Sequence, residues 1–272
     1  MPANPLDASD PASGFDGARW SSAVGTSRHW CRTVRIGLAA VIPLVCIAST
    51  ASPQEGINLS WDNCGMAGLA IKTFACDTNV GAHVLVASFA SSTGMEQLAT
   101  INAVLDLQTS GATLPDWWQF KNSGTCRQTA LSASADFATG PDGCPDPWNG
   151  AANAGIAQYQ VGFGGPNRAR ILAAALSMFG DCFVIPAGTE QMAFKLILSN
   201  VSTVGAGSCG GCADGACIVL NSMYLAQCNG PNFNLTMPLS RNFVTWQGGI
   251  PDCPAATPAQ NRTWGALKTL YR

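Results

Sequence analysis

The sequence predicts an all-β protein, an antiparallel β-sandwich that is held together by disulfides and carries few short helices. Three observations lead to this prediction. Apolar residues alternate, or run in short blocks, between Gly, Pro, Asn and Asp residues, which is the pattern of short strands. Ten of the 12 cysteines follow residue 51. Segments with helical spacing are scarce, so we expect a jelly-roll or immunoglobulin-like sandwich.

The first part of the chain has the pattern of an export signal. Arg28, Arg32 and Arg35 precede the apolar run 36–48, and small residues follow it up to Ala51. A positive region, a short apolar stretch and small residues at a cleavage point are the parts of a secretory signal peptide. We therefore expect residues 28–51 to be removed, and residues 1–27 to be a disordered extension or a mis-assigned start.

Export predicts a secreted protein, extracellular or periplasmic, with no stable membrane span once the signal is cleaved. The apolar run is shorter than the roughly 20 residues that a membrane-spanning helix needs. A retained anchor is the lesser alternative. Lipid attachment at Cys46 is another, although Val45 precedes this cysteine where a small residue is usual.

The remaining chain divides into one β-sandwich domain, residues 52–250, and a C-terminal linker with a short docking segment, residues 251–272. Residues 52–272 hold ten Lys and Arg against 13 Asp and Glu. Nucleic acid is excluded as a partner, since phosphate binding needs a basic surface. Neutral Gly, Ala, Ser, Thr and Asn fill most polar positions, as in many extracellular β proteins.

Ten strands are expected in order along the chain. They are 57–61, 83–89, 101–108, 117–120, 157–163, 170–175, 192–199, 216–225, 233–237 and 243–246. The segments 83–89 and 101–108 carry the strongest pattern, with one helical turn expected between them at 95–99. In 192–199 the apolar residues alternate about Lys195, which predicts a sheet edge or a solvent-facing side there. Helices are expected at 148–157 and 263–271.

The cysteines that follow the leader are expected to form up to five disulfides, because an even number in an exported chain is typical of a disulfide framework. They are Cys64, Cys76, Cys126, Cys144, Cys182, Cys209, Cys212, Cys217, Cys228 and Cys253. Local pairing favours Cys64 with Cys76 and Cys126 with Cys144. The cluster Cys209, Cys212 and Cys217 has two alternatives, a redox pair or a zinc site with Cys228 as the fourth ligand.

Acid–base chemistry has few candidates. His83 is the histidine that remains after the leader, and it lies at a strand end, where a structural role is favoured. Paired carboxylates could hydrolyse glycosides. The candidates for such a pair are Asp106, Asp116, Asp136, Glu96 and Glu190. Most Asp residues stand beside Gly, Pro or Asn, where turn formation accounts for them.

Hard oxygen ligands gather in two short segments, at Asp77 and Asn79 and at Asp142 and Asp146. Such ligands suit calcium. Neither segment matches the 12-residue calcium loop of EF-hands, so we expect structural turns, with calcium as the alternative and no other cofactor.

Tryptophans supply the candidate ligand site. Successive side chains of a strand point to opposite faces, so Trp117 and Trp118 would not both enter one core layer. One of them would be exposed, or covered by the loop between Cys126 and Cys144 together with Trp148. An exposed ring next to amide side chains can stack on a sugar. These three residues are therefore the predicted ligand-binding residues, with carbohydrate or a cell-surface component as the partner.

Several short motifs resemble a group of secreted, cysteine-rich bacterial β proteins. They are Trp61-Asp-Asn-Cys64, Phe74-Ala-Cys-Asp-Thr-Asn79, Asp116-Trp-Trp-Gln-Phe120, Cys209-Gly-Gly-Cys212, Cys217-Ile-Val-Leu-Asn-Ser222 and the end 263–272. This resemblance covers nearly all of the mature chain and implies no activity. The strand order also resembles cohesin-like and sugar-binding sandwiches in architecture, and a shared fold does not transfer function.

The sequence thus predicts a secreted, non-catalytic binding or structural module that acts on carbohydrate or in surface adhesion. The alternative is a secreted, carboxylate-dependent hydrolase of the glycosidase type.

Overall fold

The computed structural model describes residues 54–178, 180–251 and 253. The predicted signal peptide, residues 28–51, the extension 1–27 and the predicted helix 263–271 lie outside this range. The strands are β1 Gly56–Trp61, β2 Ile71–Lys72, β3 Ala82–Ala90, β4 Met95–Thr109, β5 Leu131–Ser134, β6 Ala152–Val161, β7 Arg168–Ser177, β8 Phe183–Ile185, β9 Gln191–Ser199, β10 Ala216–Gln227, β11 Phe233–Leu235 and β12 Phe243–Trp246. Two 3₁₀ turns, η1 Gly65–Ala67 and η2 Asp116–Trp118, complete the described elements.

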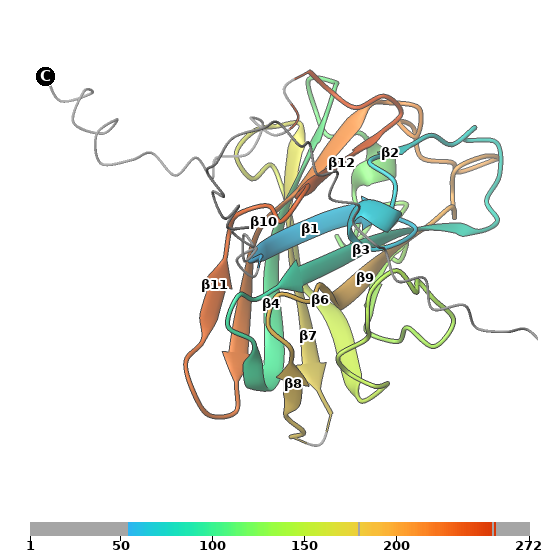
Figure 1. Cartoon of the computed structure of the whole chain (residues 1–272). Helices are drawn as coiled ribbons and strands as arrows, with labels where there is room; N and C mark the ends of the chain where they lie inside the picture. Colours follow the sequence, from blue (N-terminus) through green and yellow to red (C-terminus); the bar gives the residue numbers. More distant parts are fainter. Residues whose placement is uncertain (1–53, 179, 252, 254–272) are drawn as a thin grey trace, which may run out of the picture. The chain divides into compact units, whose positions relative to one another are not determined.

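The strands form two packed sheets, which confirms the predicted all-β sandwich. The smaller sheet has the order β1-β3-β9-β5, and the larger one has the order β2-β12-β10-β4-β7-β6, with β11 added to β10 and β8 to β4. All these pairs are antiparallel except the short β2–β12 pair. In Figure 1 the strands β1 and β3 of the smaller sheet cross in front of β4, β7 and β10 of the larger sheet.

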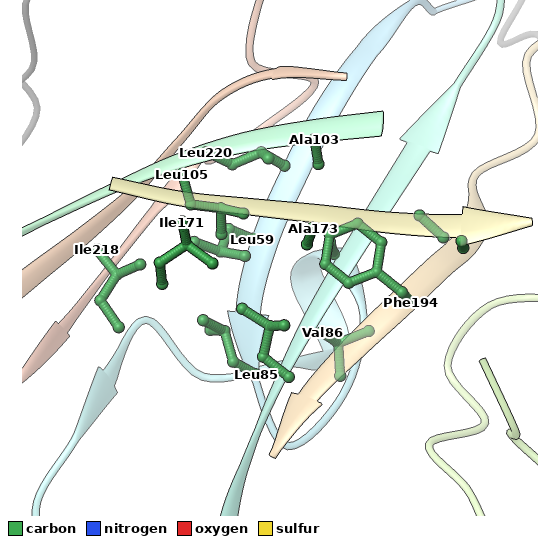
Figure 2. Packing of buried hydrophobic residues seen from close by; sticks show 14 of the residues in the cluster. Leu59, Leu85, Val86, Ala103, Leu105, Ile171, Ala173, Phe194, Ile218 and Leu220 are labelled. Atoms are coloured by element: carbon green, nitrogen blue, oxygen red, sulfur yellow. The ribbon is translucent and has the colours of Figure 1, made fainter. Parts of the chain in front are cut away.

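Alternation along each strand places one set of side chains between the sheets. On β4, Ile101, Ala103, Leu105 and Leu107 are buried in the main core cluster, while the residues between them point to the opposite face of the sheet. Figure 2 shows the packing of this core between the two sheets, with Leu59, Leu85 and Phe194 from the smaller sheet and Leu105, Ile171, Ala173 and Leu220 from the larger one.

The smaller sheet is also covered on its outer side. Val86 on β3 and Lys195 on β9 are register partners that point away from the larger sheet, and both are buried. The segment 135–151 crosses this side, and the Cys64–Cys144 disulfide links it to the turn that follows β1. The prediction that Lys195 marks a sheet edge or solvent face is therefore wrong, because β9 pairs with β3 and β5 and a loop covers it.

Five disulfides form, but the two predicted local pairs are wrong. The bonds join Cys64–Cys144, Cys76–Cys212, Cys126–Cys209, Cys182–Cys228 and Cys217–Cys253, with sequence separations from 36 to 136 residues. Local pairing was expected from loop closure, whereas the sandwich brings distant loops together at its ends. Five such bonds are typical of a protein that matures in an oxidising compartment.

Three local predictions are also corrected. The segment 117–120 is not a strand, since Trp117 and Trp118 lie in the turn η2. The expected helical turn at 95–99 is the first part of the long strand β4. The expected helix at 148–157 is a turn followed by β6, whose backbone pairs with β7 from Ala152 onward. In the described part of the chain, no helix is long and apolar enough to cross a membrane.

Candidate functional site

The three tryptophans predicted to bind a ligand are core residues. Trp117, Trp118 and Trp148 each have a relative exposure of 0%. A 3₁₀ turn lets Trp117 and Trp118 enter the same core, which alternating side chains on a strand would not allow. Trp148 lies apart from them, donates its indole N–H to the Ala193 carbonyl at 2.9 Å and packs edge-on against Phe183. None of the three rings is available to stack on a sugar at the surface.

Trp117 and Trp118 belong to an aromatic cluster centred on Trp246 of β12. The Trp246 ring stacks on Trp117 at 5.2 Å between centroids and packs against Trp118 at 5.7 Å, Trp61 at 6.0 Å and His83 at 4.8 Å. Its indole N–H donates to the Cys212 carbonyl at 2.7 Å. This cluster therefore joins β1, β3, η2 and β12 with the disulfide-rich segment.

A buried cation completes the cluster. Arg127 is fully buried, and its guanidinium carbon lies 3.8 Å from the centre of the Trp117 ring. The guanidinium donates to the carbonyls of Ser199 and Val201 at 2.7 and 2.8 Å. Burial lowers the pKa of Arg127 to about 10, so the group keeps its charge at neutral pH. We interpret Arg127 as a structural anchor for the loop after β9.

The cysteine cluster is a set of structural bridges. Cys209, Cys212 and Cys217 bond to Cys126, Cys76 and Cys253 respectively. The proposed redox pair does not form, because its two sulfurs are bonded to different loops. The zinc alternative fails too, since Cys228 is bonded to Cys182 and zinc needs free thiolates.

Three of the four calcium candidates accept hydrogen bonds from nearby loops, and the fourth, Asp77, is exposed. Asn79 accepts from the backbone N–H groups of Thr203 and Val204 at 2.7 and 2.9 Å, so it fixes the loop after β9. Asp146 accepts from the N–H of Trp148 at 2.8 Å, and Asp142 accepts from an asparagine amide at 3.3 Å. Among the described residues, no group of three His, Cys, Asp or Glu could hold a metal ion.

The five candidate carboxylates are distributed over β4, η2 and two loops. Glu190 accepts from Asn58 Nδ2 and Ser88 Oγ, both at 2.6 Å, under the turn η1. Gly65 makes this contact possible, because a Cβ there would come within 2.4 Å of the Glu190 carboxylate. Asp106 is buried on β4, whereas Asp116, Asp136 and Glu96 are exposed on η2, a loop and the start of β4.

The described surface has two hollows near some of its carboxylates. One, of about 440 Å³, lies between the start of β4 and the β10–β11 turn, and Glu96 is its only carboxylate. The other, of about 280 Å³, lies on the outer side of the smaller sheet and contains Asp62. Neither hollow brings two carboxylates together, which is what a glycosidase pair requires.

His83 is the second residue of β3 and is 8% exposed. Its ring packs edge-on against Phe74 and Trp246, and its Nε2 has no hydrogen-bond partner in the described part of the chain. Burial lowers the pKa of His83 below 6.5; Lys72 and Arg127 act in the same direction, while Asp62 and Asn200 oppose them.

This lowered pKa predicts a loss of stability in mild acid. The unfolded chain takes up a proton near pH 6.5, before the folded one does, so the free energy of unfolding should fall as the pH drops from about 6.5 towards 5, by at most ~1.4 kcal/mol per pH unit. Above pH 6.5 this contribution should be constant. Denaturant unfolding of the wild type and His83→Phe between pH 8 and 5 tests it. An equal slope in both proteins would contradict the assignment, since phenylalanine keeps the packing and removes the titration.

The best candidate for a functional surface is the outer face of the larger sheet. We define this outer face by the outward residues of four neighbouring strands. They are Gln158 and Gln160 on β6, Leu172, Ala174 and Leu176 on β7, Thr100, Asn102 and Val104 on β4, and Ser222 and Tyr224 on β10. Leu176 is 48% exposed and Tyr224 is 41% exposed. This face has aliphatic side chains in the middle, with amides and a tyrosine around them. Such a composition is typical of a binding surface.

One ion pair lies at the end of this outer face. Arg170 on β7 donates from Nε and Nη2 to the two carboxylate oxygens of Asp106, both at 2.7 Å. Asn221 donates to Asp106 as well, at 2.8 Å, and the Arg170 guanidinium lies 3.6 Å from the centre of the Phe163 ring. The two charges neutralise each other, so the outer face is close to uncharged.

Sequence reasoning missed this surface, although a signal for it was present. On β7 the run Arg170-Ile-Leu-Ala-Ala-Ala-Leu176 has apolar residues on both faces of the strand. A strand that is apolar on both faces normally meets a second layer. In the described structure only the side of Ile171 and Ala173 has one, which leaves Leu172 and Leu176 on the open side.

Comparisons with known proteins add a distant structural match. No family model and no curated protein matches the chain. Among solved structures, the chain is similar to a cohesin module from Clostridium perfringens ATCC13124 family 33 glycoside hydrolase. The TM-score is 0.31 at 9% identity, with 70% of this chain and 93% of that chain covered. The assignment of the sandwich therefore depends on the observed strand pairing, and the candidate site depends on its own residues.

Proposed function

We propose that the protein is an exported, non-catalytic binding module that holds a partner protein on the outer face of the larger sheet. The observation that carries the proposal is the apolar row of half-buried Leu172 and exposed Leu176, set among uncharged polar side chains on a regular sheet. Protein interfaces combine such an apolar centre with a polar rim, and charged residues are depleted at their centre. A partner with a neutral, flat surface matches this composition.

Carbohydrate is the second candidate partner, because Tyr224 offers an exposed ring near Asn102 and Asn234, its register partners on β4 and β11. Amide side chains bond sugar hydroxyls well, and an aromatic ring can stack on a pyranose. The aliphatic residues at the centre favour the protein partner. The dispersed carboxylates give the hydrolase alternative less support than either binding function.

A charge on the exposed part of the outer face tests the proposal. Leu176→Asp should weaken binding about 30-fold or more, because a buried carboxylate without a partner costs at least ~2 kcal/mol in an interface. Met66→Asp is the matched control, since Met66 is 76% exposed on η1, away from the larger sheet. The partner is captured from the secreted protein fraction of the native host, identified by mass spectrometry, purified, and titrated against both variants.

Equal affinity of the wild type and Leu176→Asp for the purified partner would contradict the proposal. Retention of the wild type on insoluble polysaccharide alone, lost in Tyr224→Ala, would favour carbohydrate instead.

A further inference from the structure

A separate hollow lies on the other side of the molecule, on the outer side of the smaller sheet. It has a volume of about 280 Å³ and is lined by Asp62, Val84, Thr139, Gly140, Pro141 and Lys195. Its floor is the sheet itself, because Val84 lies on β3 and Lys195 on β9. Its roof is the loop 135–151, which the Cys64–Cys144 disulfide holds in place.

The cation in this hollow has fewer partners than its charge requires. Lys195 is 8% exposed, and its ammonium donates to the Gly140 carbonyl at 3.1 Å and lies 5.6 Å from the centre of the Phe137 ring. An ammonium has three N–H donors, so two remain for another acceptor. Among the described residues, no carboxylate lies within the 4.0 Å of a salt bridge to Lys195. A buried charge without a counter-ion is costly, which favours an anion beside it.

Asp62 at the hollow does not fill this role. Its Oδ2 pairs with Lys72 Nζ at 2.5 Å, outside the reach of Lys195. The Lys72–Asp62 pair is neutral as a unit, so Lys195 supplies the net positive charge of the hollow. Asp62 Oδ1 and the Thr139 hydroxyl remain as polar groups that can bond the hydroxyls of a ligand.

We propose that this hollow binds a small hydroxylated monocarboxylate, with its carboxylate on Lys195. One lysine balances one negative charge, so a dianion such as a phosphate would leave one charge unbalanced in the hollow. The volume of the hollow, about 280 Å³, suits a molecule the size of a monosaccharide. It lies just below the range of the pockets that bind drug-sized ligands. A uronate has this chemistry, since it combines one carboxylate with several hydroxyls. This site is independent of the outer face of the larger sheet.

Titration with sodium glucuronate, followed by NMR at constant ionic strength, tests the proposal. We expect saturable shifts confined to residues around Val84, Gly140 and Lys195, while glucose, which has the same hydroxyls and no charge, should bind at least tenfold more weakly. Lys195→Met keeps the apolar stem and should weaken glucuronate binding at least tenfold. Lys121→Met, at an exposed lysine, is the control and should leave binding unchanged.

A second variant keeps the test valid if Lys195→Met fails to fold. Val84→Phe narrows the hollow from its floor and leaves the lysine in place, so it should also weaken binding. Equal shifts with glucuronate and glucose, unchanged affinity in Lys195→Met, or the absence of any saturable shift in the wild type would each overturn the proposal. None of these results depends on a partner at the outer face of the larger sheet.

Discussion

Replacing Trp246 by alanine should lower the free energy of unfolding by about 4 kcal/mol, the largest effect that we expect from one substitution. Trp246 is fully buried and touches the rings of Trp61, Trp117, Trp118 and His83. Alanine would leave a void among four elements, and the rigid rings and nearby disulfides would restrict its collapse. Denaturant unfolding with the disulfides intact measures the effect.

Two matched variants separate packing from hydrogen bonding. Trp246→Phe keeps much of the ring contact and loses the N–H bond to the Cys212 carbonyl, so a smaller loss of about 1–2 kcal/mol is expected. Met237→Ala removes a side chain that is 63% exposed and should change the stability by less than about 0.5 kcal/mol. If Trp246→Ala lowered the free energy of unfolding no more than Met237→Ala does, Trp246 would not be central to the stability of the fold.

Arg127→Met should lower the free energy of unfolding by about 3 kcal/mol. Methionine fills much of the space of the arginine stem, but it leaves the Ser199 and Val201 carbonyls without their donors in a buried place. The stacking on Trp117 is lost as well.

Arg127→Lys separates charge from shape. Lysine restores the charge, but it lacks the planar group that donates to both carbonyls and stacks on the Trp117 ring. The stability of Arg127→Lys should therefore fall between those of Arg127→Met and the wild type. A wild-type stability for Arg127→Met would show that the buried cation is dispensable, as in proteins where apolar residues replace buried ions without loss. Unfolding curves of the three proteins in the same denaturant decide this.

The strands that alternate clearly could be predicted from the sequence. The predicted strand 243–246 has the bounds of β12, and those at 57–61, 83–89 and 192–199 differ from β1, β3 and β9 by a residue or less at each end. The short strands β2, β5 and β8 have two to four residues and no pattern of their own. They exist because a neighbouring strand offers hydrogen-bond partners, which a single sequence does not show.

The candidate sites were harder to predict, because they depend on which surfaces stay uncovered. The pair Trp117 and Trp118 has the propensity of a strand, yet a 3₁₀ turn buries both rings. Alternation predicts that Lys195 faces solvent, but the loop 135–151, which lies well before β9 in the sequence, covers it and makes it a buried cation. In both places the long-range packing decides the exposure.

The disulfide connectivity has a consequence for the order in which bonds can form as the chain is oxidised. Cys64 and Cys76 emerge early and stand 12 residues apart, whereas their partners lie 80 and 136 residues further on. Until those partners arrive, the shortest loop that oxidation can close joins Cys64 to Cys76, a bond that the finished protein lacks. Production of the folded protein therefore calls for a host that reshuffles wrong bonds as well as making new ones, such as one supplied with a disulfide isomerase.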